Sequence, residues 1–220
     1  MTVMQIVQQL FGSMGITMEI FFVTLITSLI LGLGLALIRM SKNPILSVIA
    51  KFYISVMRGT PLMLQLLVVY FGPFFIFGMQ ITPSYRLKAV LIGFALNYAA
   101  YFAEIYRSGI AAIPVGQYEA ARMLGYSKTQ TFAYIVMPQV IKRILPAVTN
   151  EVITLVKDTS IARIISMQEL IYSGYAFLKG SHGYSGLLWP IFFTGVYYLA
   201  FNGILTLLFG RIEKRLQYFS

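Results

Sequence analysis

The sequence predicts an all-α membrane protein, and three observations predict this class. Hydrophobic residues make up 58% of the 220 residues, and the mean hydropathy is +0.78. Charged residues make up only 11%, whereas a soluble domain carries about 25%. Several apolar stretches approach the roughly 20 residues that a membrane-spanning helix needs. No internal repeat or low-complexity linker divides the chain, so we expect one transmembrane domain over residues 1–220.

Five stretches of the chain are candidate membrane-spanning helices. They cover residues 15–38, 61–77, 87–106, 136–156 and 187–209. We expect the second helix to start several residues before Pro61. The fourth stretch is the weakest, because Pro138, Pro146 and Glu151 lie inside it. An odd number of spans places the two termini on opposite sides of the membrane.

The Lys and Arg residues predict the orientation. If the N-terminus lies outside, twelve of the 17 basic residues fall on the inner side and five on the outer side. Cytoplasmic loops carry the excess of positive charge, so the C-terminus is expected in the cytoplasm. The same rule accounts for the net charge of +10 without nucleic acid as a partner. The N-terminus lacks a basic stretch before its apolar residues, so no cleavable signal peptide is expected.

Composition argues against several kinds of chemistry. The chain contains no Cys, which excludes a disulfide, a thiol nucleophile and a Cys-based metal site. The single histidine, His182, cannot form a histidine cluster. No pair of Ser and His suggests a hydrolase, so a membrane-embedded enzyme is poorly supported. We expect no bound metal and no catalytic residue in this chain.

The longest predicted inside loop contains a short helix of its own. Pro114 favours a helix start, and Gly125 suits the left-handed residue that ends a helix. Ser127 and Gln130 fit a capping box for a following helix. A helix of two to three turns is marginal alone in water, so it needs a surface to pack against. Either it rests on lipid headgroups or it docks into another protein.

The residues of this loop resemble a known motif. Glu119-Ala120-Ala121, followed by Gly125, Ile135 and Pro138, resembles the EAA motif of the membrane permease subunits of bacterial ABC importers. Met137 stands where that motif has Leu, a volume-conserving exchange. Three further stretches are similar to the polar amino-acid uptake branch: "RGTPLMLQL" at 58–66, "AYFAEIYRSGIAAIPVGQ" at 100–117 and "LVKDTSIARIIS" at 155–166. The resemblance covers roughly residues 15–210.

This resemblance implies a type I ABC importer permease with five transmembrane helices and a cytoplasmic coupling helix at about 117–127. It implies a bacterial inner-membrane location, two ATPase subunits that bind ATP and Mg, a second permease copy (identical or a close paralogue) and an extracytoplasmic amino-acid-binding protein. This chain lacks a GxxxxGK[ST] run, so the ATPase must be a separate chain. We expect Glu119 and Gly125 to set the docked geometry. The coupling residues are Glu119, Ala120, Ala121, Leu124 and Gly125, with Ala121 and Leu124 filling the ATPase cleft.

Ionisable groups inside predicted spans are candidates for the substrate site. Glu151 lies in the fourth stretch, and Asp158, Thr159 and Ser160 follow where we expect the helix to be interrupted, as in transporters with broken helices. The alternatives are an ion pair for Glu151 and helix caps for the other three residues. Two carboxylates favour Arg, Lys or His as substrate. Asn97 either binds substrate or bonds across helices.

Charged residues near the inner membrane surface form a possible gate. Arg58, Glu104 and Arg107 are its members, with an ion pair between helices or simple snorkelling as alternatives. Gly32, Gly34 and Ala36 are expected to permit close helix contact. The competing class of protein is an ion-gradient-driven amino-acid transporter or channel, in which Glu151 and Asp158 hold a proton or Na⁺. A docking helix between the spans distinguishes the ATP-driven importer from it.

Overall fold

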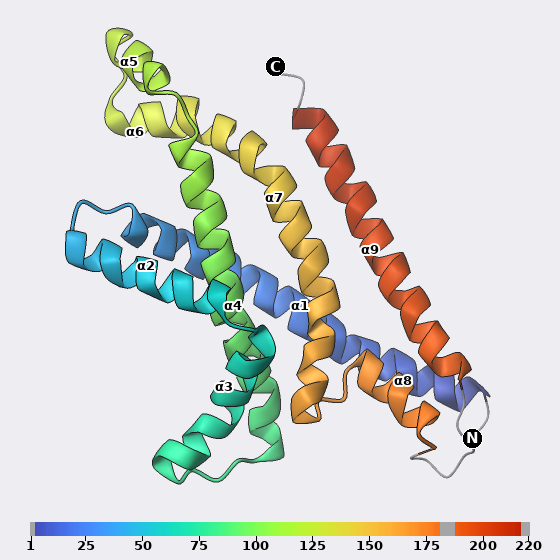
Figure 1. Ribbon diagram of the computed structural model, residues 1–220. Coiled ribbons are helices and arrows are strands. Elements are labelled where there is room, and N and C mark those ends of the chain that lie inside the picture. Colours follow the sequence, from blue (N-terminus) through green and yellow to red (C-terminus); the bar gives the residue numbers. More distant parts are fainter. Residues whose placement is uncertain (1–2, 181–187, 217–220) are drawn as a thin grey trace.

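The computed structural model describes residues 3–180 and 188–216, and this part of the chain is helical without strands (Figure 1). The elements are α1 (Val3–Arg39), α2 (Pro44–Gly59), α3 (Leu62–Phe77), α4 (Pro83–Ala111), α5 (Val115–Met123), α6 (Lys128–Gln130), η1 (Thr131–Val136, a π-helix), α7 (Met137–Asp158), η2 (Thr159–Ile165, a 3₁₀-helix), α8 (Leu170–Leu178) and α9 (Trp189–Leu216). His182 and the first residue of the fifth predicted span lie outside the described residues.

Helix α4 is the central element of the fold. Helices α1, α2, α3 and α7 all pack against it, and its buried residues include Phe94, Tyr98 and Phe102. Gly32 of α1 is required at one crossing, because an added Cβ would lie 2.8 Å from the Phe102 Cβ and 3.1 Å from the Ala99 carbonyl oxygen. Gly32 and the buried Ala36 therefore permit the close helix contact expected from the sequence. Gly34 does not, since no atom lies within 4 Å of its added Cβ.

Three described helices, α1, α4 and α9, are long and apolar enough to cross a membrane, and α2 with α3 forms a fourth candidate bent by 107°. We expected the second span to start several residues before Pro61 as one helix, and this prediction is wrong. Pro61 caps α3, and the preceding residues belong to α2, which runs in another direction. Proline lacks the N–H that a continuous helix would use. Helix α7 covers residues 137–156 of the fourth predicted stretch, and it is not among the described helices that are long and apolar enough to cross a membrane.

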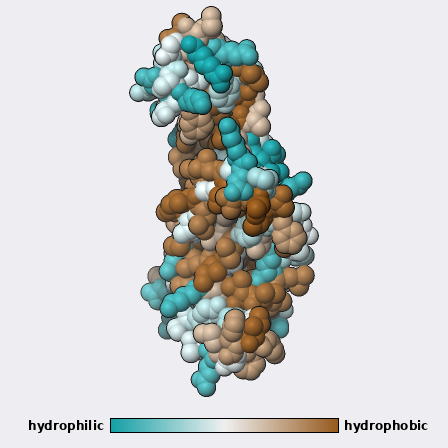
Figure 2. Space-filling view, turned by 90° about the vertical axis from the view of Figure 1, so that its left-hand side faces the viewer, coloured by the Kyte–Doolittle hydropathy of each residue, from teal (hydrophilic) through white to brown (hydrophobic). Residues whose placement is uncertain are grey.

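The helices α5 and α6 lie beyond the end of α4, at one extremity of the molecule (Figure 1). The described C-terminal end of α9 points toward the same extremity, whereas the N-terminal end of α1 lies at the opposite one. Figure 2 shows hydrophilic side chains gathered at the α5 extremity and hydrophobic side chains across the middle of the molecule. Helix α1 has 37 residues and is therefore about 55 Å long at 1.5 Å per residue, so it crosses the bundle obliquely.

Candidate functional site

The segment after α4 has the local structure that its sequence predicts. Pro114 precedes the first turn of α5, and Gly125 has a φ of +81° just after its end. The Ser127 hydroxyl accepts from the Gln130 N–H, and the Gln130 side chain accepts from the Ser127 N–H, which completes the capping box. The helix begins at Val115, two residues before the expected start, and ends at Met123.

The two sides of α5 have different roles. Ala121 is buried within the chain at 1% exposure, so it packs against the protein itself and is not available to fill a cleft in a partner. Leu124 and Met123 are exposed at 74% and 88%, and these apolar side chains are open to a partner. Glu119 and Ala120 are also exposed.

Hydrogen bonds connect this segment to α7. The Gln139 side-chain amide donates to Gln117 Oε1 at 3.2 Å, and Arg143 donates to the Ala112 carbonyl oxygen at 2.6 Å. The π-helix η1 lies between α5 and α7 in the chain. Its wider turn ends where α7 starts, and Pro138 in the first turn of α7 has no N–H. Helix α7 runs from Met137 to Asp158 with Pro146 inside it, so a single helix connects the α5 segment to the residues at its other end.

The far end of α7 carries the two expected carboxylates. Glu151 and Asp158 are half-buried and lie two turns apart on the same helix. Asp158 accepts a hydrogen bond from the buried Tyr98 hydroxyl at 2.7 Å. The α-helix changes to a 3₁₀-helix directly after Asp158, as the expected interruption requires. Asp158 makes no side-chain cap to η2, so the capping alternative does not describe it.

Thr159 and Asn97 are both engaged within the chain. Thr159 is fully buried, donates to the Val156 carbonyl oxygen at 2.7 Å, and lies 3.2 Å from the Tyr198 hydroxyl. Asn97 donates to the Met57 carbonyl oxygen and to Gln65 Oε1, each at 3.0 Å. This is the bond across helices that the sequence left as an alternative. Ser160 lies beside Thr159 in η2 and is half-buried.

The Asn97 contacts support the break between α2 and α3. The Gln65 side chain donates to the Met57 and Thr60 carbonyl oxygens at 3.0 and 3.1 Å. Backbone carbonyls freed by a helix break need such partners at membrane depth. Sequence reasoning did not single out Gln65, although its place four residues after Pro61 in an apolar run was a usable signal.

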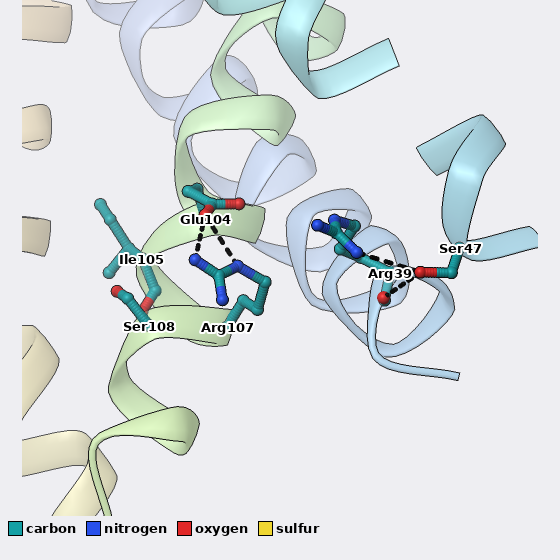
Figure 3. Close-up of polar contacts among 6 residues, drawn as sticks. All are labelled: Arg39, Ser47, Glu104, Ile105, Arg107 and Ser108. Atoms are coloured by element: carbon teal, nitrogen blue, oxygen red, sulfur yellow. Dashed lines mark hydrogen bonds and ion pairs between the residues drawn. The ribbon is translucent and has the colours of Figure 1, made fainter. Parts of the chain in front are cut away.

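The expected gate residues lie near one another. The ion pair that they form lies within one helix, whereas the sequence suggested a pair between helices. Arg107 donates to Glu104 Oε1 through Nε at 2.7 Å and through Nη2 (Figure 3), and both residues belong to α4. Arg58 of α2 instead stacks over Tyr101, with its guanidinium carbon 5.3 Å from the ring centroid.

A cavity of about 370 Å³ adjoins these gate residues, and Arg58, Glu104, Arg39 and Lys51 are among its lining residues. Arg39 donates to the Ser47 hydroxyl at 3.0 Å, and that hydroxyl donates back to the Arg39 carbonyl oxygen at 2.8 Å (Figure 3). The cavity is therefore rich in cations, and its one carboxylate is already paired with Arg107.

Glu169 is a buried carboxylate that sequence reasoning missed. It caps α8, accepting from the Ile171 and Tyr172 N–H groups at 2.8 and 2.6 Å. The Tyr198 hydroxyl donates to it at 3.5 Å. An acidic residue in the apolar stretch "MQELIYSGYAF" was the available signal. These bonds give Glu169 a structural role, because it caps α8 and connects that helix to Tyr198 of α9.

Comparison with known proteins decides the family. Residues 28–218 match the family described as "Binding-protein-dependent transport system inner membrane component", which is most of the chain. The protein belongs to this family of importer permeases. The permease is 38% identical over 204 residues to the arginine transport system permease protein ArtQ of Bacillus subtilis (strain 168), covering 93% of this chain and 90% of that one. It is 37% identical over 212 residues to the octopine transport system permease protein OccM of Rhizobium radiobacter, covering 91% and 82%.

Solved structures agree with this assignment. The permease superposes with a TM-score of 0.84 and 33% identity on a chain of an amino acid ABC transporter crystallised with histidines, covering 98% of this chain and 100% of that one. A chain of the inward-facing MetNI methionine ABC transporter shares the fold at a TM-score of 0.77 and 18% identity. The permease is thus an all-α, type I importer subunit for amino acids, and a transport component rather than an enzyme.

Proposed function

We propose that the permease imports a basic amino acid with energy from ATP hydrolysed by a separate ATPase, which docks on α5. The observation that carries this proposal is the continuity of α7. One end of α7 is hydrogen-bonded to the α5 segment through Gln139 and Arg143. The other end presents Glu151 and Asp158. A movement imposed on α5 is therefore expected to alter the surroundings of the two carboxylates.

The ATPase contact is assigned to the exposed side of α5. Leu124 and Met123 supply the apolar area, while Glu119 and Ala120 flank it. Gly125 sets the chain direction after the helix, since its φ of +81° is unfavourable for residues with a Cβ. Ala121 holds α5 against the rest of the permease. In the docked complex ATP and Mg are bound by the ATPase, and this chain transmits the movement.

The substrate site is assigned to the Glu151 and Asp158 carboxylates, with Tyr98 orienting Asp158. Two carboxylates on one face of α7 suit an ammonium or guanidinium group, because charge-assisted hydrogen bonds are the strongest polar contacts. The names of similar proteins, an arginine permease and a transporter crystallised with histidines, support this choice. We include Asn97, Thr159 and Ser160 in the proposed site, because Asn97 precedes Tyr98 in α4 and the other two follow Asp158 in η2.

The gate is assigned to Arg58, Glu104 and Arg107, on the α5 side of the two carboxylates. Arg58 over Tyr101 places a positive charge in the path of a cationic substrate. Movement of α2 relative to α4 would remove that charge from the path. This barrier would prevent back-flow while the site faces outward.

The assembly contains further subunits in this proposal. The N-terminus of the permease lies outside and its C-terminus lies in the cytoplasm, as the distribution of basic residues indicates. Two permease copies pair around the pathway, two ATPases bind the α5 segments, and an amino-acid-binding protein docks on the outer side. The position of α5 and the C-terminal end of α9 at one extremity (Figure 1) supports this arrangement.

Competitive uptake into vesicles that contain the complete transporter tests the substrate class. Glu151→Gln keeps the size of the side chain and removes its charge. A charged hydrogen-bond partner contributes about 1.5–3 kcal/mol, so we expect roughly a 10- to 100-fold rise in KM for Arg or Lys. Uptake of a neutral amino acid should change much less. The matched control is Glu19→Gln, at an exposed position on α1. Equal loss for neutral and cationic substrates would assign Glu151 a structural role.

A further inference from the structure

A chain of hydrogen-bonding groups joins the two ends of the segment between α7 and α8. Thr159 begins η2 directly after Asp158, and Glu169 caps α8 at the other end of the segment. The Tyr198 hydroxyl of α9 lies 3.2 Å from Thr159 Oγ1 and 3.5 Å from Glu169 Oε2. Tyr198 therefore bridges the start and the end of the segment, beside the carboxylate that we assign to the substrate.

This chain of oxygens has too few protons while Glu169 is charged. The Thr159 hydroxyl donates its proton to the Val156 carbonyl oxygen at 2.7 Å. The Tyr198 hydroxyl also has a single proton, which goes either to Thr159 or to Glu169. A carboxylate has no proton to donate, so one of the two contacts of Tyr198 then lacks a donor.

A proton on Glu169 completes the chain. The neutral carboxylic acid donates to the Tyr198 oxygen, and the Tyr198 hydroxyl then donates to Thr159. Glu169 is fully buried, and burial disfavours the charged form of a carboxyl group. It lies between α7 and α9, outside the described helices that are long and apolar enough to cross a membrane. Burial raises the pKa of the Glu169 carboxyl to about 7.

The groups that face Glu169 favour its charged form without outweighing burial. Two N–H groups in the first turn of α8 donate to its carboxyl oxygens, and Arg163 of η2 contributes an opposite charge. Helix α9 contributes the Tyr198 hydroxyl, and α1 meets the same turn of α8 through the uncharged Thr17. Both protonation states are therefore populated near neutral pH.

We propose that Glu169 binds a proton, and that its neutral form allows Tyr198 to hold Thr159 and so to position Asp158 for the substrate. Glu169 and Tyr198 are positioning residues, because they act through Thr159 and the backbone that follows α7. Their role rests on the proposed assignment of Asp158 to the substrate site. When Glu169 is charged, Tyr198 gives its proton to Glu169 and Thr159 loses this donor.

Hydrogen–deuterium exchange of the purified transporter complex tests this contact without substrate. The amides of residues 159–168 are followed at about pH 6 and about pH 8, on either side of the Glu169 pKa, and corrected for the intrinsic exchange rate at each pH. Below the pKa the chain is complete, so we expect roughly 2- to 10-fold more protection at the lower pH, the effect of one hydrogen bond.

Tyr198→Phe removes the bridging hydroxyl and should abolish this pH difference. Tyr197→Phe is the matched control on the same helix. The Tyr197 hydroxyl is buried and has no hydrogen-bond partner in the described part of the chain, so its loss should leave the pH difference unchanged. A pH difference that persists in Tyr198→Phe comes from another carboxyl group and overturns the proposal.

Glu169→Gln tests the proton itself. The amide keeps an oxygen for an N–H group of α8 and offers an N–H to Tyr198 at either pH, as the neutral acid does. We expect the exchange of residues 159–168 to become independent of pH. Equal protection of the wild type at the two pH values overturns the proposal, and so does a wild-type pH dependence in Glu169→Gln.

Uptake into vesicles connects this contact to transport. Tyr198→Phe should raise KM for Arg or Lys by roughly 2- to 10-fold, while Tyr197→Phe leaves KM unchanged. Helix α9 stays attached to α7 in both variants, because Glu213 of α9 accepts a hydrogen bond from Thr149 at 3.2 Å. We therefore expect similar unfolding temperatures for the two variants. An unchanged KM in Tyr198→Phe would contradict a positioning role.

The two proposals fail in different ways. If Glu151→Gln leaves the uptake of Arg and Lys unchanged, the proposed substrate site is wrong, whereas the pH-dependent exchange of residues 159–168 does not depend on that result. If Glu151→Gln raises KM as expected and Tyr198→Phe exchanges like the wild type, only the role of Tyr198 and Glu169 is wrong.

Discussion

The Tyr98 hydroxyl donates to Asp158 Oδ2 across 2.7 Å, and this bond joins the centre of α4 to the last residue of α7. Tyr98 is buried among the core residues of α4, so its hydroxyl is held in place. Asp158 is thereby oriented at the point where α7 changes into η2. The bond therefore connects the packed core to the carboxylate that we propose binds the substrate.

Tyr98→Phe should impair transport more than it impairs folding. The change removes only the hydroxyl and leaves Asp158 without this donor, and a hydrogen bond to a charged group contributes about 1.5–3 kcal/mol. We expect roughly a tenfold or greater loss of kcat/KM for a cationic substrate in vesicle uptake. Tyr134→Phe, at an exposed position in η1, should leave uptake unchanged. Wild-type uptake by Tyr98→Phe would remove Asp158 from the proposed site.

Gly125→Val should weaken the connection between the permease and its ATPase. Residues with a Cβ cost about 1–2 kcal/mol in the left-handed conformation, and a β-branched side chain is the least tolerated there. We expect α5 to change its orientation, so that less ATPase co-purifies and transport falls. Gly203→Val, in the α9 helix, controls for the loss of a glycine. Unchanged transport together with full recovery of the complex would argue against docking at α5.

Gly32→Ala should destabilise the crossing of α1 and α4. The new Cβ would lie 2.8 Å from the Phe102 Cβ and 3.1 Å from a backbone oxygen, and overpacking of this kind costs about 1–3 kcal/mol. A lower unfolding temperature of the purified complex is the expected result. Gly34→Ala, two residues along the same helix, has open space around it and should be neutral or slightly stabilising. Equal unfolding temperatures for the two variants would contradict this packing.

Asn97→Leu should destabilise the break between α2 and α3. It removes the donor to the Met57 carbonyl oxygen and to Gln65, and an unpaired buried polar group costs about 1–3 kcal/mol. We expect a lower unfolding temperature that added substrate does not restore. Asn202→Leu is the comparison variant, because it replaces another side-chain amide within an apolar helix, α9. If Asn97→Leu is as stable as the wild type and only its KM rises, Asn97 contacts substrate instead.

Local sequence was sufficient for the coupling segment. Pro114, Gly125 and the Ser127–Gln130 pair each act within a few residues of the chain, so their effects are visible without the fold. The long apolar stretches likewise indicated helices, because their composition is incompatible with a soluble surface. Charge patterning supplied an orientation that remains a prediction.

Tertiary structure decided the partners of the polar residues. Asn97 reaches Met57 and Gln65 across the break at Pro61, and Arg107 pairs with Glu104 on its own helix instead of bridging to another. Ala121 faces inward, although we expected it to fill the ATPase cleft together with the exposed Leu124. These outcomes depend on crossing angles and helix rotation, which arise from side chains far apart in sequence.

By itself, the sequence determined the helical membrane class, the position of the α5 segment and the two carboxylates of α7, because composition, caps and isolated charges are local properties. Only the tertiary structure decided that α7 links the α5 segment to those carboxylates and that Tyr98 holds Asp158. Each of these is a contact between distant segments, and contacts of this kind are set by packing.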